Sequence, residues 1–339
     1  MPLCSHAYLE QRPQEQHGGG KQGSKQIDQK QKVGTMIDTI VTMPPYAPFL
    51  GEVARHPLVS GLRLNTVMPV KESLEEVLKR LQDSAAGKTI WIDLKGRQLR
   101  VVGYATPPFT EITVSHAIKV KTPVTAYFGN GGEEAKLVAV DGNRLIFLDG
   151  PKRVVGPGES MNIVDPSLEI DGYLTETDAR YVEAAGKVGL HDYMLSYVES
   201  SADVAALQTF DAHATIAEKI ESLKGIRYVR EDYQKAKQSR LMLARGDLYT
   251  EVVKPHHILE ATELLIAKDA EAIAASRICS SLAESLEPAS QDISDIAYLL
   301  KVGYKTLMLG DEVCLRRESV LSALNLIQAI AEDYHGKGK

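Results

Sequence analysis

Short apolar runs alternate with longer amphipathic stretches from Thr39 onward. Eight runs have the length and composition of buried strands: Thr39–Met43, Gly61–Leu64, Thr89–Asp93, Tyr193–Ser196, Thr215–Glu218, Leu241–Ala244, Ala272–Ala275 and Thr306–Leu309. Helical spacing of apolar positions follows in Ser73–Ala85, Asp178–Lys187, Ala202–Phe210, His257–Lys268, Asp292–Val302 and Glu318–Glu332. Eight strands followed by helices predict an α/β fold, a closed (β/α)8 TIM barrel.

The segment between the third and fourth runs has a different pattern. Alternation with period two marks Ile112–Val120, Val124–Phe128, Lys136–Val140, Leu145–Leu148 and Met161–Val164, with turn residues between them. We therefore expect a small all-β lid domain over 103–171, inserted into a barrel made of 36–102 and 172–339. Residues 1–35 are rich in Gln, Gly and Lys, and we expect them to form a disordered tail.

Composition narrows the class of protein. The chain has 339 residues, 44% of them hydrophobic, and 39 basic against 45 acidic residues give a net charge of −6. The charge balance lacks the basic excess that phosphate-backbone binding requires, so we expect no nucleic-acid partner. We find neither an apolar run of membrane-spanning length nor a secretory signal, and the three cysteines fit no disulfide framework. The expectation is a cytoplasmic protein without membrane contact.

Polar residues stand just after several of the apolar runs. In a (β/α)8 barrel these positions share the C-terminal face, where the reactive groups of such enzymes lie. The second and third runs lead to Arg63, Asn65, Lys95 and Arg100; the fifth, sixth and seventh lead to Lys219, Glu221, Arg245, Gly246, Asp247 and Ser276. These residues form the candidate site.

Glu221 and Asp247 follow neighbouring strands, which would bring two carboxylates together. Like charges at short range need a cation, and Mg²⁺ takes oxygen ligands while keeping positions open for substrate. Lys219 lies two residues before Glu221, so both side chains would point to one side, where an ammonium would stabilise an enolate. Gly246 would let backbone N–H groups approach a bound carboxylate or phosphate. An isolated Lys-x-Glu is usually a solvated face, so the argument depends on several strand ends together.

Four sequence blocks resemble the pyruvate kinase family. Ile92-Asp93-Leu94-Lys95-Gly96 with Arg100 is similar to the family's Asp-Thr-Lys-Gly and Glu-Ile-Arg, and Leu174-Thr175-Glu176-Thr177-Asp178 is similar to its Leu-Thr-Glu-Lys-Asp. Lys219-Ile220-Glu221 resembles its Lys-Ile-Glu, and Met242–Leu248 resembles its Met-Val-Ala-Arg-Gly-Asp-Leu. The blocks keep the family's order from about Thr39 to Asp333, so the resemblance covers most of the chain.

The resemblance implies a reaction, Mg²⁺-dependent phosphoryl transfer between phosphoenolpyruvate and ADP that gives pyruvate and ATP. It implies that Glu221 and Asp247 bind Mg²⁺, that Lys219 stabilises the enolate, and that Ser276 helps to deliver its proton. Arg63 and Arg100 would hold the transferring phosphoryl group. The implied substrate-binding residues are Ala244, Arg245 and Gly246, which would receive the substrate carboxylate, together with Asn65 and Lys95.

The sequence also departs from the family. Val67 and Leu94 replace two hydroxyl-bearing potassium ligands, and Gln98 stands where potassium-independent members place a lysine, so we expect no K⁺ site. Met68 replaces a histidine on the nucleotide side, which leaves two other hypotheses open. One is a Mg²⁺-dependent lyase, aldolase or hydrolase that acts on a pyruvate-type acid without a nucleotide. The other is a catalytically silent binding protein, since fold does not guarantee function.

The C-terminal part of the sequence bears on assembly. The chain ends soon after the last helical pattern, so we expect the family's C-terminal domain, with its effector site, to be absent. Whether the protein forms a homo-oligomer stays open.

Overall fold

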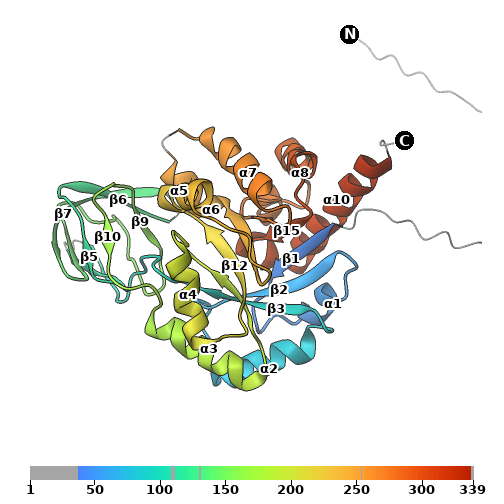
Figure 1. Ribbon diagram of the computed structural model, residues 1–339, viewed down its shortest axis with the longest axis horizontal. Helices are drawn as coiled ribbons and strands as arrows, with labels where there is room; N and C mark the ends of the chain where they lie inside the picture. The colour runs from blue at the N-terminus through green and yellow to red at the C-terminus, as the bar shows by residue number, and fades with distance from the viewer. Residues whose placement is uncertain (1–36, 108–110, 130, 253, 337–339) are drawn as a thin grey trace, which may run out of the picture. The chain divides into compact units, whose positions relative to one another are not determined.

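Eight parallel strands close into a barrel in the computed structural model, which describes residues 37–107, 111–129, 131–252 and 254–336 (Figure 1). The barrel strands are β1 (Asp38–Thr42), β2 (Val59–Asn65), β3 (Thr89–Leu94), β11 (Asp192–Leu195), β12 (Thr215–Ile220), β13 (Ser239–Ala244), β14 (Ile273–Ala275) and β15 (Thr306–Leu309). Their order around the barrel is β1-β15-β14-β13-β12-β11-β3-β2. Each predicted run overlaps one of these strands, so the predicted (β/α)8 barrel is confirmed. The predicted tail, residues 1–35, lies outside the described residues.

Helices follow the strands around the barrel. They are α1 (Leu50–Ala54), α2 (Leu74–Ser84), α3 (Glu176–Val188), α4 (Ser201–Phe210), α5 (Leu223–Glu231), α6 (Arg245–Glu251), α7 (His257–Lys268), α8 (Ser290–Val302), α9 (Asp311–Cys314) and α10 (Arg317–Gly336), with a 3-10 turn η1 at Ser280–Ala283. Helix α2 begins at a capping box in which Ser73 and Glu76 satisfy each other's backbone N–H groups. Thr175 and Asp178 cap α3 in the same way. Both caps fix where the chain turns from loop to helix.

An inserted β domain separates β3 from α3. Its five-stranded antiparallel sheet has the order β4-β8-β7-β6-β9, and β5 pairs separately with β10. The strands are β4 (Glu111–Thr113), β5 (Ile118–Lys119), β6 (Val124–Phe128), β7 (Glu133–Asp141), β8 (Arg144–Phe147), β9 (Met161–Ile163) and β10 (Glu169–Ile170), drawn in green in Figure 1. The insert has a buried cluster of its own around Phe128 and Phe147, and this cluster includes Leu99 and Val101. The predicted small β domain after the third strand is thus confirmed, while its limits at 103 and 171 stay a prediction.

One predicted strand of the insert is divided in two. The run Ile112–Val120 contributes to β4 and β5, which belong to different sheets. Val114, just after β4, forms an isolated bridge to Val101, and Ile118 of β5 donates its backbone N–H to the carbonyl of Gly142. The alternation of apolar residues continues across the break, but the two halves have different pairing partners, which a local pattern does not specify.

The inside of the barrel is filled by side chains. The inner cluster comprises Ile40, Trp91, Met194, Ala217, Met242, Ile273, Ala275 and Met308. A second, larger cluster lies between strands and helices and includes the buried free thiols of Cys279 and Cys314. Because the interior is a packed core, room for a ligand remains at the ends of the strands.

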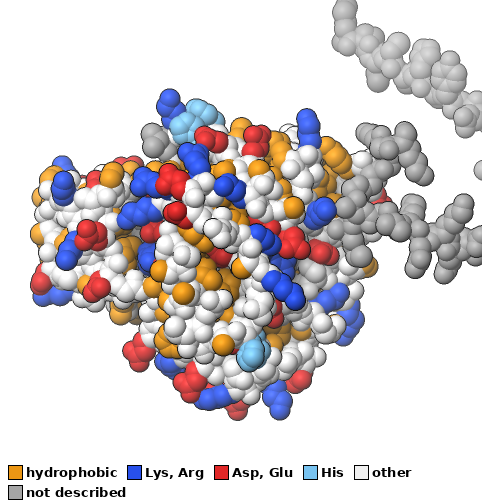
Figure 2. All heavy atoms as spheres, in the orientation of Figure 1, with side chains coloured by type: hydrophobic (Ala, Val, Ile, Leu, Met, Phe, Trp, Pro, Cys, Tyr) orange, Lys and Arg blue, Asp and Glu red, His pale blue; other side chains and the backbone are white. Residues whose placement is uncertain are grey.

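The surface carries charges of both signs. In Figure 2, basic and acidic side chains are interspersed over the face in view. This agrees with the near balance of 39 basic and 45 acidic residues. None of the helices in the described ranges is both long and apolar enough to cross a bilayer.

Candidate active site

A cavity of about 550 Å³ lies at the C-terminal ends of the barrel strands. Nine of the eleven predicted site residues line it, namely Arg63, Asn65, Lys95, Arg100, Lys219, Glu221, Gly246, Asp247 and Ser276. Ala244 and Arg245 are not among its lining residues. The insert contributes Ser160 to the wall, so the cavity lies where the barrel meets the inserted domain.

Asp93, at the end of β3, is the centre of a buried ionic cluster. Arg63 and Lys95 donate to its Oδ2, and Lys219 donates to its Oδ1 over 3.1 Å. Burial alone would raise the pKa of Asp93, but Arg63, Lys219 and Lys95 outweigh it and hold the pKa well below its usual range. One carboxylate thus orients three cationic side chains. We did not assign Asp93 to the site from the sequence. Its charge inside the otherwise apolar run of β3 would have indicated a functional position.

Arg63 and Asn65, from β2, share a second carboxylate. Arg63 Nη1 lies 3.0 Å from Asp311 Oδ2, and Asn65 Nδ2 donates to both carboxylate oxygens of Asp311 over 3.1 Å. Burial would lower the pKa of Arg63, but Asp93 and Asp311 raise it above its usual value. The guanidinium therefore stays charged and is fixed between two acids.

Lys219, in β12, lines the cavity and is buried. Its Nζ is 3.1 Å from Glu221 Oε1 and 2.7 Å from Ser196 Oγ, in addition to its contact with Asp93. Burial lowers the pKa of Lys219, but Asp93 and Glu221 reverse the effect and raise the pKa above its usual value. The side chain is therefore an ammonium at neutral pH.

Glu221 and Asp247 face the same cavity. Glu221 Oε2 accepts from the backbone N–H of Tyr197 over 2.9 Å. Burial raises the pKa of Glu221; Lys219 opposes the rise, and the negative charge of Asp247 adds to it. Asp247 has two neutral partners, because Asn162 donates to its Oδ1 over 3.2 Å and Gln98 to its Oδ2 over 3.0 Å. The pair therefore concentrates negative charge that a hard cation would balance.

The donor set fits a divalent cation held by few protein ligands. Glu221 and Asp247 offer carboxylate oxygens to one cavity. Within the described ranges, no group of three or more His, Cys, Asp or Glu side chains is arranged to hold a metal. Two carboxylates, completed by substrate and water, are the kind of site that Mg²⁺ accepts.

Side-chain amides join the insert to the barrel at this point. Arg100 donates from Nη1 to the carbonyl of Gly158 over 2.6 Å and from Nε to Gln98 Oε1 over 3.0 Å. Gln98 in turn donates to Asp247, and Asn162 of β9 donates to the same carboxylate. The insert thus contacts the metal-ligand candidate directly, a role that our sequence analysis missed for Asn162.

The loop after β3 is held from both sides. Asp178 accepts from the backbone N–H groups of Lys95 and Gly96, over 2.8 and 3.1 Å. Gly96 has a φ of +51°, and a Cβ there would lie 2.6 Å from the carbonyl oxygen of Ser196. Only glycine fits this position without a shift of the backbone. The cap of α3 therefore also positions the loop that carries Lys95.

Arg245 turns its side chain away from the cavity. Its Nη1 and Nη2 lie 2.6 and 2.7 Å from the two carboxylate oxygens of Asp295, and its Nε donates to the carbonyl of Ser276. Ser276 itself lines the cavity, and so does Arg277, whose guanidinium lies 4.1 Å from the ring centroid of Tyr249. Arg277 is a cavity residue that we did not assign to the site from the sequence.

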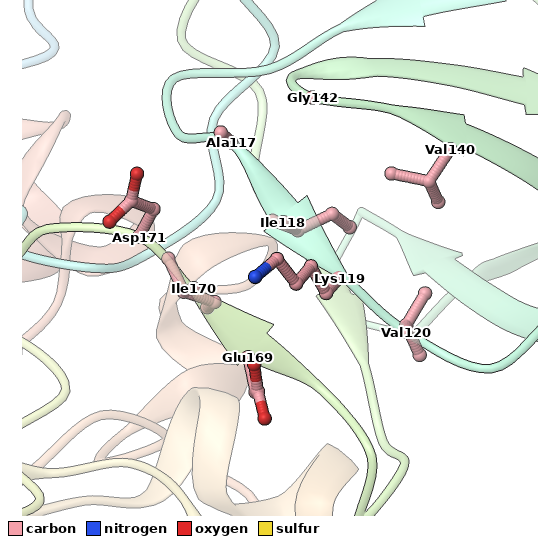
Figure 3. Close-up of a pocket in the computed structure, with 9 residues that line it drawn as sticks. All are labelled: Ala117, Ile118, Lys119, Val120, Val140, Gly142, Glu169, Ile170 and Asp171. Carbon is pink, nitrogen blue, oxygen red and sulfur yellow. The ribbon is translucent and has the colours of Figure 1, made fainter.

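A second hollow of about 530 Å³ lies in the insert. Ile118 and Ile170 of the β5–β10 pair line it together with Val140 of β7 (Figure 3). None of the predicted site residues lines this hollow.

Fold and site together define a (β/α)8-barrel protein with an ionic cavity at the C-terminal face. The family model described as pyruvate kinase, barrel domain, matches residues 138–315, more than half of the 339 residues. The chain therefore belongs to the pyruvate kinase family. It is 22% identical over 298 residues to the pyruvate kinase of Methanocaldococcus jannaschii, covering 82% of this chain and 66% of that protein.

Two other relatives are similar at the same level. Identity to the pyruvate kinase of Borreliella burgdorferi is 25% over 303 residues, covering 81% of this chain and 62% of that protein. For the pyruvate kinase of Thermoplasma acidophilum, identity is 22% over 302 residues, covering 81% of this chain and 54% of that protein. The matches thus span between 54% and 66% of the length of these relatives.

Proposed function

We propose that the protein transfers a phosphoryl group between phosphoenolpyruvate and ADP, giving pyruvate and ATP, with Mg²⁺ on Glu221 and Asp247. The observation that carries the proposal is the buried ammonium of Lys219, 3.1 Å from Glu221 Oε1 in the cavity that Asp247 also lines. The family to which the chain belongs supports this class of reaction. Mg²⁺, when bound, would neutralise charge on the phosphoryl and enolate oxygens.

Lys219 is suited to stabilise the enolate. The raised pKa keeps its charge at neutral pH, and its contacts with Asp93 and Ser196 fix its position before substrate arrives. A preorganised cation in a site sheltered from water lowers the energy of the developing oxyanion. The hydroxyl of Ser276 lies beside the start of α6, since a Cβ at Gly246 would be 3.5 Å from its Oγ. From there it would help to deliver the proton.

Two arginines are proposed to hold the phosphoryl group. Arg63 is already bound to Asp93 and Asp311, whereas Arg100 is bound to the neutral Gln98 and a carbonyl. Arg100 therefore keeps its full charge for a phosphoryl group, and guanidinium forks bind such groups through two hydrogen bonds. We assign the larger share of phosphoryl binding to Arg100.

The remaining predicted residues are proposed to orient the substrate. The backbone of Ala244, Arg245 and Gly246 forms the start of α6, where N–H groups lack helical partners and attract a carboxylate. Asn65 and Lys95 form the wall on the β2–β3 side. The insert would act as a lid that excludes water.

One experiment tests the reaction. Purified protein is incubated with Mg²⁺, phosphoenolpyruvate and ADP while ³¹P NMR follows the phosphates, and exchange of the pyruvate methyl protons in D₂O is measured in parallel. Lys219→Met is expected to lower either rate by about 10²–10³-fold, because it removes a preorganised cation. Lys224→Met is the matched control, since Lys224 is exposed and donates to the carbonyl of Leu168.

The outcomes separate the three hypotheses. ATP formation that depends on Lys219 supports the proposal. Methyl exchange without ATP formation rejects it in favour of the lyase class. Absence of both activities in the wild type rejects catalysis and leaves a binding protein. An unchanged rate in Lys219→Met removes Lys219 from the mechanism.

A further inference from the structure

Arg277 differs from the other cationic residues of the cavity in its partners. The side chains of Arg63, Lys95 and Lys219 are each bound to the carboxylate of Asp93. Arg277 is exposed and lines the same cavity, but within the part of the chain that the structure describes it forms no ion pair with an acidic side chain. Its positive charge is therefore available to an anion that enters the cavity.

Tyr249, in α6, supports the guanidinium of Arg277 from one face. The guanidinium carbon lies 4.1 Å from the centroid of the tyrosine ring, within the range of a cation–π contact. Stacking uses the flat face of a guanidinium, whereas its N–H groups point outward in the plane. These N–H groups thus stay free, and two of them match the two oxygens of a carboxylate.

The backbone at Ser276 and Arg277 has a conformation that residues with side chains rarely adopt. Their φ angles are +67° and +58°, both in the left-handed region. Such conformations persist where the surrounding structure holds them, and they are concentrated at functional sites. Both residues follow β14 and line the cavity. The unusual turn therefore places two polar side chains at the cavity wall.

Arg277 and Arg100 approach the cavity from opposite sides of the barrel. Arg277 follows β14 and Arg100 follows β3, and the strands between them are β13, β12 and β11 in one direction and β15, β1 and β2 in the other. Arg100 is the residue proposed to bind the phosphoryl group. Gly246, where the substrate carboxylate is proposed to bind, lies on the side of Arg277, because a Cβ there would be 3.5 Å from Ser276 Oγ. The anion expected at Arg277 is thus the carboxylate.

We propose that Arg277 is a specificity-determining residue, which binds the carboxylate of the three-carbon acid through its in-plane N–H groups while Tyr249 holds its position. The inference rests on the proposed function for the identity of the acid. It extends that function by giving the carboxylate a side-chain partner. A binding measurement without turnover tests it independently.

Calorimetric titration in the presence of Mg²⁺ is the first measurement. The probes are oxalate, a small planar dicarboxylate with the size of enolpyruvate, and inorganic phosphate. Arg277→Met removes the charge and keeps a stem of similar length, so we expect the Kd for oxalate to rise about tenfold, as for the loss of one charged hydrogen bond. The Kd for phosphate should change less than about twofold. Arg100→Met should have the opposite effect on the two probes.

Three further variants separate the charge from its support. Arg277→Lys should recover part of the oxalate affinity, since an ammonium keeps the charge but lacks the fork. Tyr249→Leu should raise the Kd for oxalate about threefold, because the guanidinium loses its platform. Arg240→Met is the matched control: Arg240 also lies over an aromatic ring, 5.1 Å from the centroid of Trp91, but near the start of β13 and outside the cavity lining. It should change neither affinity.

Steady-state kinetics provides the second measurement. For Arg277→Met, KM for phosphoenolpyruvate should rise about tenfold, while kcat changes less than about threefold. This split is expected because a carboxylate contact is the same in the bound substrate and in the transition state. KM for ADP should stay unchanged.

The outcomes distinguish this inference from the proposed reaction. Equal oxalate affinity in the wild type and Arg277→Met, an equal loss for oxalate and phosphate, or a wild type that binds no oxalate would each overturn the role of Arg277. Oxalate binding that depends on Arg277 without any turnover would support that role and reject the reaction. Turnover with an unchanged KM in Arg277→Met would support the reaction and reject the role. If Arg277→Met does not fold, Arg277→Gln takes its place.

Discussion

Replacement of Asp93 by asparagine tests the ionic cluster most directly. Asp93→Asn keeps the shape of the side chain but removes the negative charge that Arg63, Lys95 and Lys219 share. Asp93 is completely buried, so water cannot replace it. Removing one partner of a buried ion pair costs about 3–5 kcal/mol, and we expect the free energy of unfolding at pH 7 to fall by that amount.

The pH dependence gives a second, independent reading. The folded-state pKa of Asp93 lies well below its usual range, whereas an unfolded aspartate titrates at about 3.9. The stability that its charge contributes is complete above the unfolded pKa and is lost as the pH falls toward the folded pKa. The difference between the wild type and Asp93→Asn should therefore shrink below about pH 4.

Urea unfolding followed by tryptophan fluorescence suits this measurement. Trp91 is the single tryptophan of the chain, lies in β3 two residues before Asp93 and is 3% exposed. Asp311→Asn is the matched control, because Asp311 also pairs with Arg63 but its side chain is 35% exposed; we expect a loss of about 1 kcal/mol. A loss below about 1 kcal/mol for Asp93→Asn, or a difference that does not narrow in acid, would refute the buried cluster.

Two further predictions concern the supports of the site. Gly96→Ala should lower the free energy of unfolding by about 2–4 kcal/mol, since a Cβ would lie 2.6 Å from the Ser196 carbonyl at a positive φ. Gly186 occupies an open helical position of α3, so Gly186→Ala should instead raise the free energy of unfolding by about 0.4–1 kcal/mol. Similar effects of Gly96→Ala and Gly186→Ala on thermal unfolding would contradict the steric argument. Arg245→Lys should cost about 1–2 kcal/mol by losing the paired contact with Asp295, with KM for phosphoenolpyruvate changed less than about twofold in steady-state kinetics. A large rise in KM without a loss of stability would place the guanidinium of Arg245 in the substrate site.

The barrel strands could be predicted from the sequence because they are buried on both faces. A parallel strand covered on both faces forms a nearly continuous apolar run, as in Leu241–Ala244 of β13, and such runs stand out from amphipathic helices. Short helices gave no comparable signal. Helix α6 has seven residues and includes Gly246, and α9 has four, too few to show a period. Helices of this length depend on packing against the barrel rather than on their own sequence.

The candidate site could be predicted from the sequence only in part. The position of Lys219 two residues before Glu221 is local, and in the structure the two side chains lie 3.1 Å apart. Contacts between segments that are distant in the sequence could not be predicted from local spacing. Asn162, for example, reaches Asp247 from the insert, 85 positions away in the sequence.

The sequence by itself determined the number and order of the barrel strands and which strand ends carry charged residues, because apolar runs and the polar residues beyond them are properties of adjacent positions. Only the tertiary structure decided how those charges pair. Lys95 is bound to Asn65 and Asp93, whereas Arg245 turns away to Asp295. Ion pairs form between whichever charges the closed barrel brings within a few ångströms, and that distance is not encoded in any local stretch of the chain.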